Sequence, residues 1–298
     1  MTVFQKTLPF SGVATALVTP FSGGSLDIPA LRRLLAYQWE SGVHAVVVAG
    51  TTGEASTLTD TERDTVTREA VAALKGRLPV IVGTGSNDTR RAVEYSRRAA
   101  ESGADALLVV TPYYNKGTER GVVEHYLRIA DAVTVPVILY NVPSRTGVDL
   151  TMPQYEALAA HERIVAVKEA KGDVSRLADL RARFADGTLH VYTGNDCEFL
   201  PALSMGASGV VSVLSNLFPA DMANAYRLFV SGKGQEAAAI MRHLHTTARL
   251  LFRETNPAPV KDALAILGLC SAETRLPLSG VTSALHEALA DELKMLGL

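Results

Sequence analysis

The feature that most constrains the fold is a repeated alternation of two kinds of segment. Eight short apolar runs alternate with longer amphipathic segments. The apolar runs are GVATALVTP (12–20), HAVVVAG (44–50), LPVIVGTG (78–85), ADALLVVTP (104–112), VPVILYNVP (135–143), RIVAVKEA (163–170), LHVYTGN (189–195) and ASGVVSV (207–213). Strands that are apolar throughout are typical of a parallel sheet that is covered on both faces. Eight such strands favour closure into a TIM (β/α)8 barrel over an open doubly wound sheet.

The segments between the runs have the pattern of amphipathic crossover helices. Examples are IPALRRLLAYQWESG, TERDTVTREAVAALKG, DTRRAVEYSRRAAESG and GDVSRLADLRARFADG, several of which end on a glycine suited to a helix C-terminus. After residue 215 the pattern changes, and only helical segments follow, at 218–232, 235–254, 259–268 and 282–297. We therefore predict a barrel over residues 1–218 and a C-terminal helical region, packed on the barrel, over residues 219–298.

Charge and composition exclude several classes of function. The formal net charge is -2, and the 29 basic and 31 acidic residues form no long block of one sign, so nucleic acid is not an expected partner. The N-terminus MTVFQKTLPF has no apolar run of secretory length, and no stretch is long enough to span a membrane, which predicts a cytoplasmic protein. Cys197 and Cys270 have neither metal-ligand spacing nor a histidine cluster beside them, so we expect structural thiols and no metal.

Lys168 stands out because it directly follows IVAV, the four apolar residues 164–167 of the run 163–170. In a TIM barrel the active site lies at the carboxyl ends of the strands, and of the eight lysines only Lys168 is expected there. The other seven are assigned to the N-terminal tail, outer helices, loops or a C-terminal helix: Lys6, Lys75, Lys116, Lys171, Lys233, Lys261 and Lys294. A desolvated amine loses its proton more easily, and a neutral amine can attack a ketone to form a Schiff base. Alternatively, Lys168 extends to the surface or pairs with Glu169.

Residues at the other strand ends would converge with Lys168 on one small cavity. They are Thr51, Thr52, Tyr113, Tyr114, Tyr140 and Gly194. In GTTGE (50–54), two hydroxyls and backbone N–H groups at a helix start suit a small carboxylate, although a loop of this composition is more often a turn with an N-cap. A phenol at Tyr140 could shuttle protons with the help of Thr52 and Tyr114, or could be a core aromatic. Arg145 offers a fork for a second carboxylate, or is simply a surface arginine.

Four motifs together resemble the dihydrodipicolinate synthase family of pyruvate-dependent class I aldolases, whose superfamily also contains N-acetylneuraminate lyase. The motifs are GTTGE, TPYYN (111–115), YNVPSRTG (140–147) and VKEA (167–170), and the similarity runs from about residue 10 to the end of the chain, through NPAPVK (256–261). The resemblance implies a cofactor-free lyase reaction in which pyruvate condenses with L-aspartate 4-semialdehyde to give 4-hydroxy-tetrahydrodipicolinate. That step leads toward diaminopimelate and lysine.

The resemblance also implies a role for each site residue. Lys168 would form the Schiff base with pyruvate, whose carboxylate Thr51 and Thr52 would hold. Tyr140, Thr52 and Tyr114 match a proton relay, to which Tyr114 would be contributed across a tight dimer interface of a homotetramer, a dimer of dimers. Arg145 matches the residue that binds the semialdehyde carboxylate. Backbone at Gly194 and Val211 would line the pyruvate pocket.

Two other functions remain open at this point. A sugar-acid aldolase of the same superfamily would share the lysine and the tyrosine, although its lyase members typically carry serine at the position of Thr51 and lack an arginine that matches Arg145. A catalytically silent barrel that acts as a binding or regulatory protein would leave the whole set of polar strand-end residues unexplained.

The regulatory site of lysine-inhibited relatives is altered in this sequence. Asn87 and Tyr113 match the family, but Arg91 stands at the acidic position, and Asp60 and Arg63 stand at the histidine positions. Because a cation repels a cationic ligand, we predict weak or absent inhibition by lysine.

Overall fold

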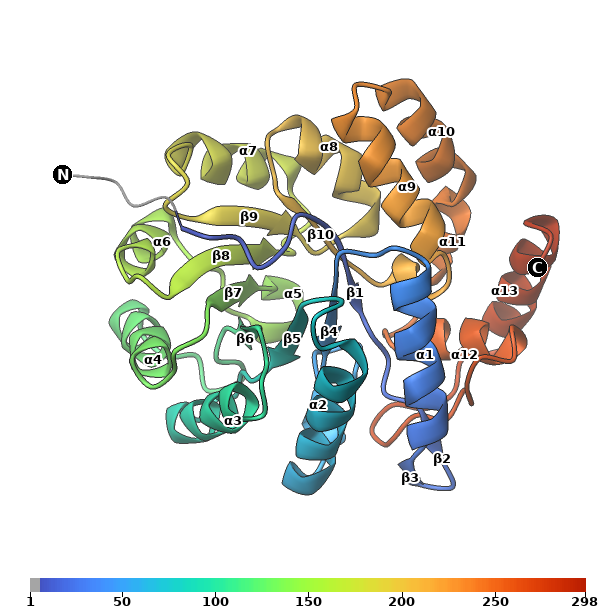
Figure 1. Cartoon of the computed structure of the whole chain (residues 1–298), viewed down its shortest axis with the longest axis horizontal. Helices are drawn as coiled ribbons and strands as arrows, with labels where there is room; N and C mark the ends of the chain where they lie inside the picture. The colour runs from blue at the N-terminus through green and yellow to red at the C-terminus, as the bar shows by residue number, and fades with distance from the viewer. Residues whose placement is uncertain (1–5) are drawn as a thin grey trace.

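Eight parallel strands close into a barrel in the computed structural model, which describes residues 6–298 (Figure 1). The barrel strands are β1 (Gly12–Ala16), β4 (Ala45–Val48), β5 (Val80–Gly83), β6 (Ala106–Val110), β7 (Val137–Asn141), β8 (Ile164–Glu169), β9 (His190–Thr193) and β10 (Gly209–Ser212). Each lies within one of the eight predicted runs, and β1 closes the barrel by pairing with both β10 and β4. The prediction of a (β/α)8 barrel is confirmed.

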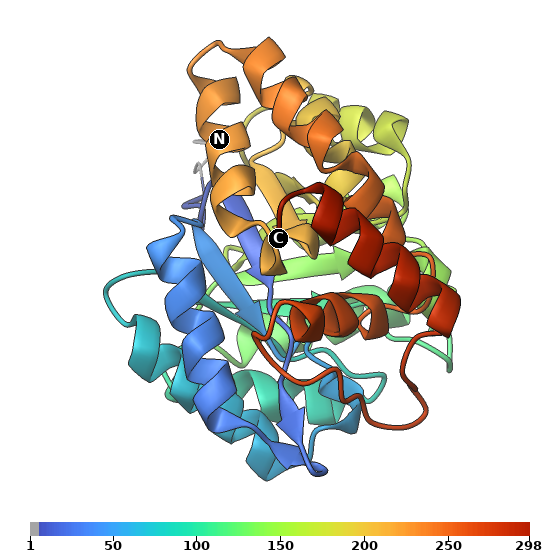
Figure 2. The same cartoon turned by 90° about the vertical axis from the view of Figure 1, so that its right-hand side faces the viewer.

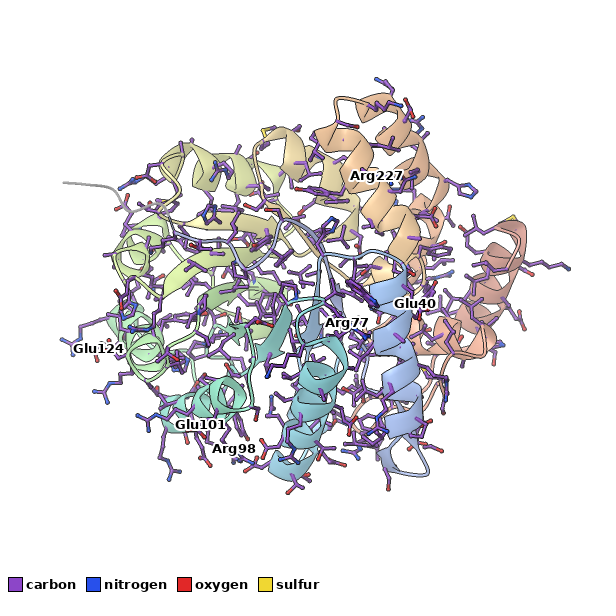
Figure 3. The ribbon with its side chains drawn as sticks, viewed as in Figure 1. Glu40, Arg77, Arg98, Glu101, Glu124 and Arg227 are labelled. Atoms are coloured by element: carbon purple, nitrogen blue, oxygen red, sulfur yellow. The ribbon has the colours of Figure 1, made fainter. Side chains whose placement is uncertain are left out.

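Helices surround the barrel, as the amphipathic segments predict. They are α1 (Ile28–Glu40), α2 (Asp60–Leu74), α3 (Thr89–Glu101), α4 (Glu119–Asp131), α5 (Pro143–Thr146), α6 (Met152–Ala159), α7 (Val174–Arg183) and α8 (Phe199–Ser204), with short 3-10 turns η1 (Ala55–Thr57), η2 (Asp196–Glu198) and η3 (Leu214–Asn216). Helix starts are fixed by side chains: Asp27 accepts a hydrogen bond from Ala30 N, and Thr59 forms a capping box with Glu62. Exposed carboxylates such as Glu101 and Glu124 project outward from this ring of helices (Figure 3).

Two apolar cores lie on the two sides of the barrel wall. The outer core fills the space between strands and helices, and the inner core fills the barrel itself. Near the amino-terminal end of the strands, Phe10 stacks on Tyr192 with ring centroids 4.2 Å apart. Lys6 fixes the preceding segment, because its Nζ donates to three carbonyl oxygens, at Ala159, His161 and Ile164. The barrel is therefore a packed core with its open cavity at the opposite end.

One irregularity in β8 decides which way its side chains point. The register between β7 and β8 shifts by one residue, because Val137 pairs with Ile164 whereas Ile138 pairs with Ala166. Val165 and Ala166 consequently both belong to the inner core, although successive residues of a regular strand face opposite sides. After the bulge the alternation resumes with Val167 in the outer core. The next residue, Lys168, therefore faces the barrel interior.

The chain after the barrel is helical, with no strand among the described residues beyond β10. Its helices are α9 (Pro219–Val230), α10 (Gly234–His243), α11 (His245–Leu250), α12 (Ala258–Ile266) and α13 (Ser283–Met295). The predicted helical segment 235–254 forms two helices, since α10 ends at His243 and α11 ends at Leu250. Figure 2 shows α12 and α13 side by side against the barrel. The division of the chain at residue 218 stays a prediction.

A short antiparallel hairpin follows β1, which the sequence pattern did not predict. Strands β2 (Phe21–Ser22) and β3 (Ser25–Leu26) are joined by Gly23 and Gly24. Both glycines have positive φ, at 58° and 80°, as a tight two-residue hairpin turn requires. The strands are only two residues long, which is too short for a periodic signal.

Residues 6–298 contain no helix that is both long and apolar enough to cross a membrane. Within the same range, no group of three or more His, Cys, Asp or Glu side chains could hold a metal ion. Cys197 and Cys270 are free thiols. The absence of a secretory run rests partly on residues 1–5, which lie outside the described part of the chain.

Candidate active site

Lys168 lies inside the barrel, near the carboxyl end of β8. Its side chain is buried, with 6% of the residue exposed, and its backbone pairs with Tyr140 on β7. The Lys168 Nζ atom lies 4.1 Å from the centroid of the Tyr140 ring. The alternative that Lys168 extends to the surface is therefore wrong.

Glu169 points to the other side of the barrel wall and is not the partner of Lys168. Its carboxylate accepts hydrogen bonds from Asn141 Nδ2 at 3.0 Å, from the Tyr155 hydroxyl at 2.9 Å and from Lys171 N at 2.9 Å. Burial raises the pKa of Glu169, while these hydrogen bonds oppose the shift. The network ties the ends of β7 and β8 together behind the site, and so fixes the position of Lys168.

Gly194 gives Lys168 the space that it needs. A Cβ atom at Gly194 would lie 2.8 Å from Lys168 Cε and 2.6 Å from Ala170 Cβ, which is too close for any side chain. Val211, on β10, is fully buried in the inner core. The structure thus brings Gly194 close to the lysine stem and places Val211 in the core that fills the barrel.

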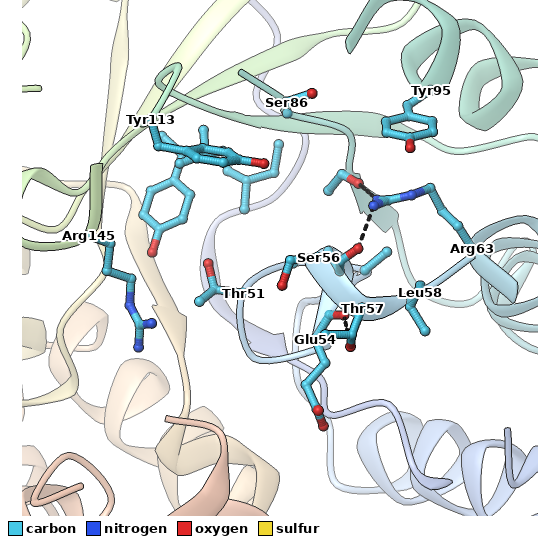
Figure 4. Close-up of a pocket in the computed structure, with 18 of the residues that line it drawn as sticks. Thr51, Glu54, Ser56, Thr57, Leu58, Arg63, Ser86, Tyr95, Tyr113 and Arg145 are labelled. Atoms are coloured by element: carbon cyan, nitrogen blue, oxygen red, sulfur yellow. Dashed lines mark hydrogen bonds between the residues drawn. The ribbon is translucent and has the colours of Figure 1, made fainter. Parts of the chain in front are cut away.

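A cavity of about 580 Å³ opens at the carboxyl end of the strands. Its lining includes three of the predicted site residues, Thr51, Tyr140 and Arg145, and also Tyr113. Figure 4 shows Thr51 facing Arg145 across this cavity, with the Tyr113 ring beside them. Hydroxyl, phenol and guanidinium groups therefore surround one space, a combination that can bind and protonate a small carboxylated molecule.

Thr52 is buried beside the cavity and is held by a residue that sequence reasoning missed. Only 3% of Thr52 is exposed, and its Oγ1 accepts a hydrogen bond of 2.9 Å from Asn256 Nδ2. The main-chain oxygen of Asn256 accepts a second bond, of 3.2 Å, from Arg145 Nη2. Asn256 opens the NPAPVK segment, whose similarity to the family was the only signal that could have found it.

The loop that carries Thr51 and Thr52 is anchored by a fully buried ion pair. Lys261 Nζ, on α12, lies 2.6 Å from Glu54 Oε1, and both side chains are 0% exposed. Burial lowers the pKa of Lys261, and Glu54 opposes that shift. Lys261 lies on a C-terminal helix as predicted, but it is at least as buried as Lys168. Burial alone therefore does not single out Lys168; its place inside the barrel does.

Tyr114 does not join the other residues within one chain. It is 89% exposed and has a left-handed backbone, with φ of 71°, whereas its neighbour Tyr113 lines the cavity. The expectation that all the strand-end residues converge on one cavity is wrong for Tyr114 in a single chain.

The outer part of the cavity is lined by the altered regulatory positions. Arg63 is buried, donates to Gly83 O and Ala55 O, and lies with its Cζ atom 4.4 Å from the centroid of the Tyr95 ring (Figure 4). The Arg91 Cζ atom lies 5.6 Å from the centroid of the same ring, and Arg91 Nη2 lies 3.5 Å from Asp60 Oδ1. The cations of Arg63 and Arg91 therefore flank this part of the cavity.

The closed barrel, with polar and charged groups around a cavity at the carboxyl ends of its strands, has the architecture of the (β/α)8-barrel enzymes. Residues 9–296 match the model of the dihydrodipicolinate synthetase family. A 4-hydroxy-tetrahydrodipicolinate synthase of Geobacter metallireducens is 45% identical over 287 residues, which cover 96% of this chain and 98% of that protein. The chain belongs to the dihydrodipicolinate synthetase family.

Two solved structures carry the comparison further. The chloride-inhibited dihydrodipicolinate synthase of Acinetobacter baumannii, in complex with pyruvate, superposes with a TM-score of 0.94 at 40% identity, covering 96% of this chain and 99% of that one. The enzyme of Cyanidioschyzon merolae with lysine bound gives a TM-score of 0.94 at 38% identity, covering 98% of this chain and 100% of that one. Neither relative differs from this chain in overall fold.

Proposed function

We propose that Lys168 is the amine through which this chain condenses pyruvate with L-aspartate 4-semialdehyde, the reaction of a 4-hydroxy-tetrahydrodipicolinate synthase. The synthase activity follows from membership of the family. The observation that supports Lys168 as the reactive group is its buried amine, inside the barrel and 4.1 Å from the Tyr140 ring. A lysine held in that way can add to a ketone without competition from bulk water.

The reaction would proceed by covalent catalysis in four steps. The Lys168 amine adds to the ketone carbon of pyruvate, and loss of water gives an imine. A proton leaves the methyl carbon to give an enamine, whose carbon attacks the aldehyde carbon while the aldehyde oxygen takes up a proton. The amino group of the added half then attacks the imine carbon, closes the ring and expels the Lys168 amine. The chemistry needs no cofactor.

The residues around Lys168 would divide the remaining work. Thr51 and Thr52 would bind the pyruvate carboxylate, and Tyr140, whose ring contacts the lysine amine, would carry protons to and from the imine. Arg145, across the cavity from Thr51, would bind the carboxylate of the semialdehyde. The close approach of Gly194 to Lys168 supports the assignment of its backbone to the pyruvate pocket, which Val211 would also line.

The assembly is part of the proposal. Tyr114 would complete the relay of Tyr140 and Thr52 from the neighbouring subunit of a tight dimer, and two such dimers would form a homotetramer. Its 89% exposure supports this role, because a phenol that served its own cavity would not face solvent. We expect the enzyme to act in the cytoplasm, as a member of an amino-acid biosynthetic route.

Borohydride trapping tests the lysine assignment directly. Incubation with pyruvate and borohydride should label one residue covalently, and peptide mass spectrometry should place the label on Lys168. Lys168→Ala should abolish labelling, while Lys171→Ala, three residues further along, should keep it, since Lys171 pairs with Asp149 outside the barrel. A label on any other lysine would refute the assignment. Absence of any label would favour the alternative of a barrel that has no catalytic activity.

Turnover then separates the synthase from a sugar-acid aldolase. Product formation from pyruvate and L-aspartate 4-semialdehyde, coupled to dihydrodipicolinate reductase, should collapse in Lys168→Ala and Arg145→Ala. If pyruvate is trapped but this aldehyde is not turned over, the Schiff-base assignment stands and L-aspartate 4-semialdehyde is refuted as the acceptor substrate.

A further inference from the structure

Among residues 6–298, Asn256 is the one that hydrogen-bonds to groups proposed for both substrates. Its side-chain amide donates from Nδ2 to Thr52 Oγ1 at 2.9 Å, and its main-chain oxygen accepts from Arg145 Nη2 at 3.2 Å. The residue lines the cavity and is 4% exposed. Two atoms of one residue thus contact the pyruvate side and the semialdehyde side separately.

The Thr52 contact has a defined direction. A threonine hydroxyl carries one proton and two acceptor lone pairs, and the Asn256 amide occupies one of the lone pairs. Because the amide donates, the Thr52 proton cannot also point at Asn256. The proton is therefore left available for another acceptor, such as a substrate carboxylate. Asn256 Oδ1, the other side-chain atom, is buried without a hydrogen-bond partner among residues 6–298.

An ion pair from helix α12 fixes the position of Asn256 relative to the loop that carries Thr52. Lys261, five residues after Asn256, pairs with Glu54, two residues after Thr52. The second Glu54 oxygen accepts a bond of 3.0 Å from Arg275 N, and Lys261 Nζ lies 4.2 Å from the centroid of the Phe21 ring. Glu54 contributes to the cavity lining, and its side chain extends away from Thr51 and Arg145 in Figure 4, so the ion pair holds the loop from the far side of Thr51.

We propose that Asn256 is a positioning residue that fixes the direction of the Thr52 proton, so that Thr52 acts as a donor toward the reacting groups. This inference rests on the proposed function of Thr52 in the proton relay. It assigns a catalytic consequence to the C-terminal region, which supplies Asn256, Pro277 and Leu278 to the lining of the cavity.

Asn256→Ala removes the amide and keeps the main-chain oxygen. We expect kcat to fall about tenfold or more, as the loss of one directed hydrogen bond in a proton relay allows. The KM for L-aspartate 4-semialdehyde should stay within about twofold, because the bond to Arg145 uses the backbone. Asn224→Ala, on the outer helix α9, is the matched control and should leave both constants unchanged.

A double-mutant cycle identifies the route of the effect. Thr52→Val removes the hydroxyl, so Asn256→Ala added to Thr52→Val should change kcat by less than about twofold. If the two effects multiply instead, Asn256 acts independently of Thr52 and the proposal fails.

Asn256→Asp can reverse the direction of the hydrogen bond to Thr52. The pH dependence of its activity then distinguishes proton positioning from a purely structural role. An ionised carboxylate can only accept, and would draw the Thr52 proton away from the cavity, whereas a protonated carboxyl can donate as the amide does. The activity of Asn256→Asp relative to wild type should therefore rise as pH falls, while that of Asn256→Ala should not. A pH profile parallel to that of Asn256→Ala would overturn the proposal.

Borohydride trapping separates this proposal from the one on which it rests. Wild type and all Asn256 variants should be labelled by pyruvate at Lys168. Failure of the wild type to be labelled would refute the Schiff base itself, whereas normal labelling with unchanged kcat in Asn256→Ala would refute only the positioning role.

Discussion

Replacing Lys261 with methionine should destabilise the protein more than any substitution of a surface lysine. The Lys261–Glu54 pair is 2.6 Å long and wholly buried, so the substitution leaves the Glu54 carboxylate without its cation in a site closed to water. Removing one partner of such a pair typically costs about 3–5 kcal/mol. At about 2.1 cal/mol/K per residue, the 298-residue chain has an unfolding entropy near 0.6 kcal/mol/K. The expected fall in Tm is therefore about 5–8 °C.

Calorimetry and urea unfolding at fixed protein concentration would measure this loss. Lys233→Met is the matched control, because Lys233 and Glu236 form an exposed helical pair, and it should change the stability by less than about 1 kcal/mol. Glu54→Gln combined with Lys261→Met should recover part of the loss, since the Gln oxygen can still accept from Arg275 N. A loss below about 1 kcal/mol in Lys261→Met would refute the reasoning, since it would mean that Glu54 finds another partner or takes up a proton at little cost.

Three further predictions concern pH, regulation and the space around Lys168. Burial lowers the pKa of His125 to about 4, so the unfolded chain binds a proton at this residue more readily than the folded protein does. The free energy of unfolding should therefore fall by up to about 3 kcal/mol as the pH is lowered from 6.5 to 4. Urea unfolding at several pH values should show a weaker dependence of that free energy on pH in His125→Gln than in wild type. L-Lysine at millimolar concentration should leave turnover nearly unchanged, because Arg91 adds a cation beside the outer cavity, and half-inhibition at sub-millimolar lysine would contradict this. Gly194→Ala should abolish pyruvate trapping and lower Tm, because the new methyl group would displace Lys168 Cε and overlap Ala170 Cβ; normal trapping would show that the lysine stem can shift.

The barrel could be predicted because its signal is local and repeated. Each strand is an apolar run, and each helix has a periodic apolar face, so the order of elements is visible in the sequence. Contacts between distant segments leave no such signal. The bond from Asn256 to Thr52 joins residues 204 positions apart, and the Lys261–Glu54 pair joins residues 207 positions apart. Lys261 was assigned correctly to a C-terminal helix, but nothing local indicated that its charge would be buried.

Strict alternation of side chains along β8 predicts the wrong orientation for Lys168. Ile164 faces the outer core, so strict alternation from Ile164 would also turn residues 166 and 168 outward, toward the helices. The extra residue at the register shift between β7 and β8 reverses that phase, so Ala166 and Lys168 face inward, while Glu169 takes the outward place and bonds to Asn141 and Tyr155. A single bulge thus turns the Lys168 amine into the barrel, beside the Tyr140 ring that lines the cavity, and turns the Glu169 carboxylate to the other side of the barrel wall. The position of Lys168 at a strand end was predictable from the sequence, whereas its orientation depends on a pairing with β7 that only the closed barrel defines.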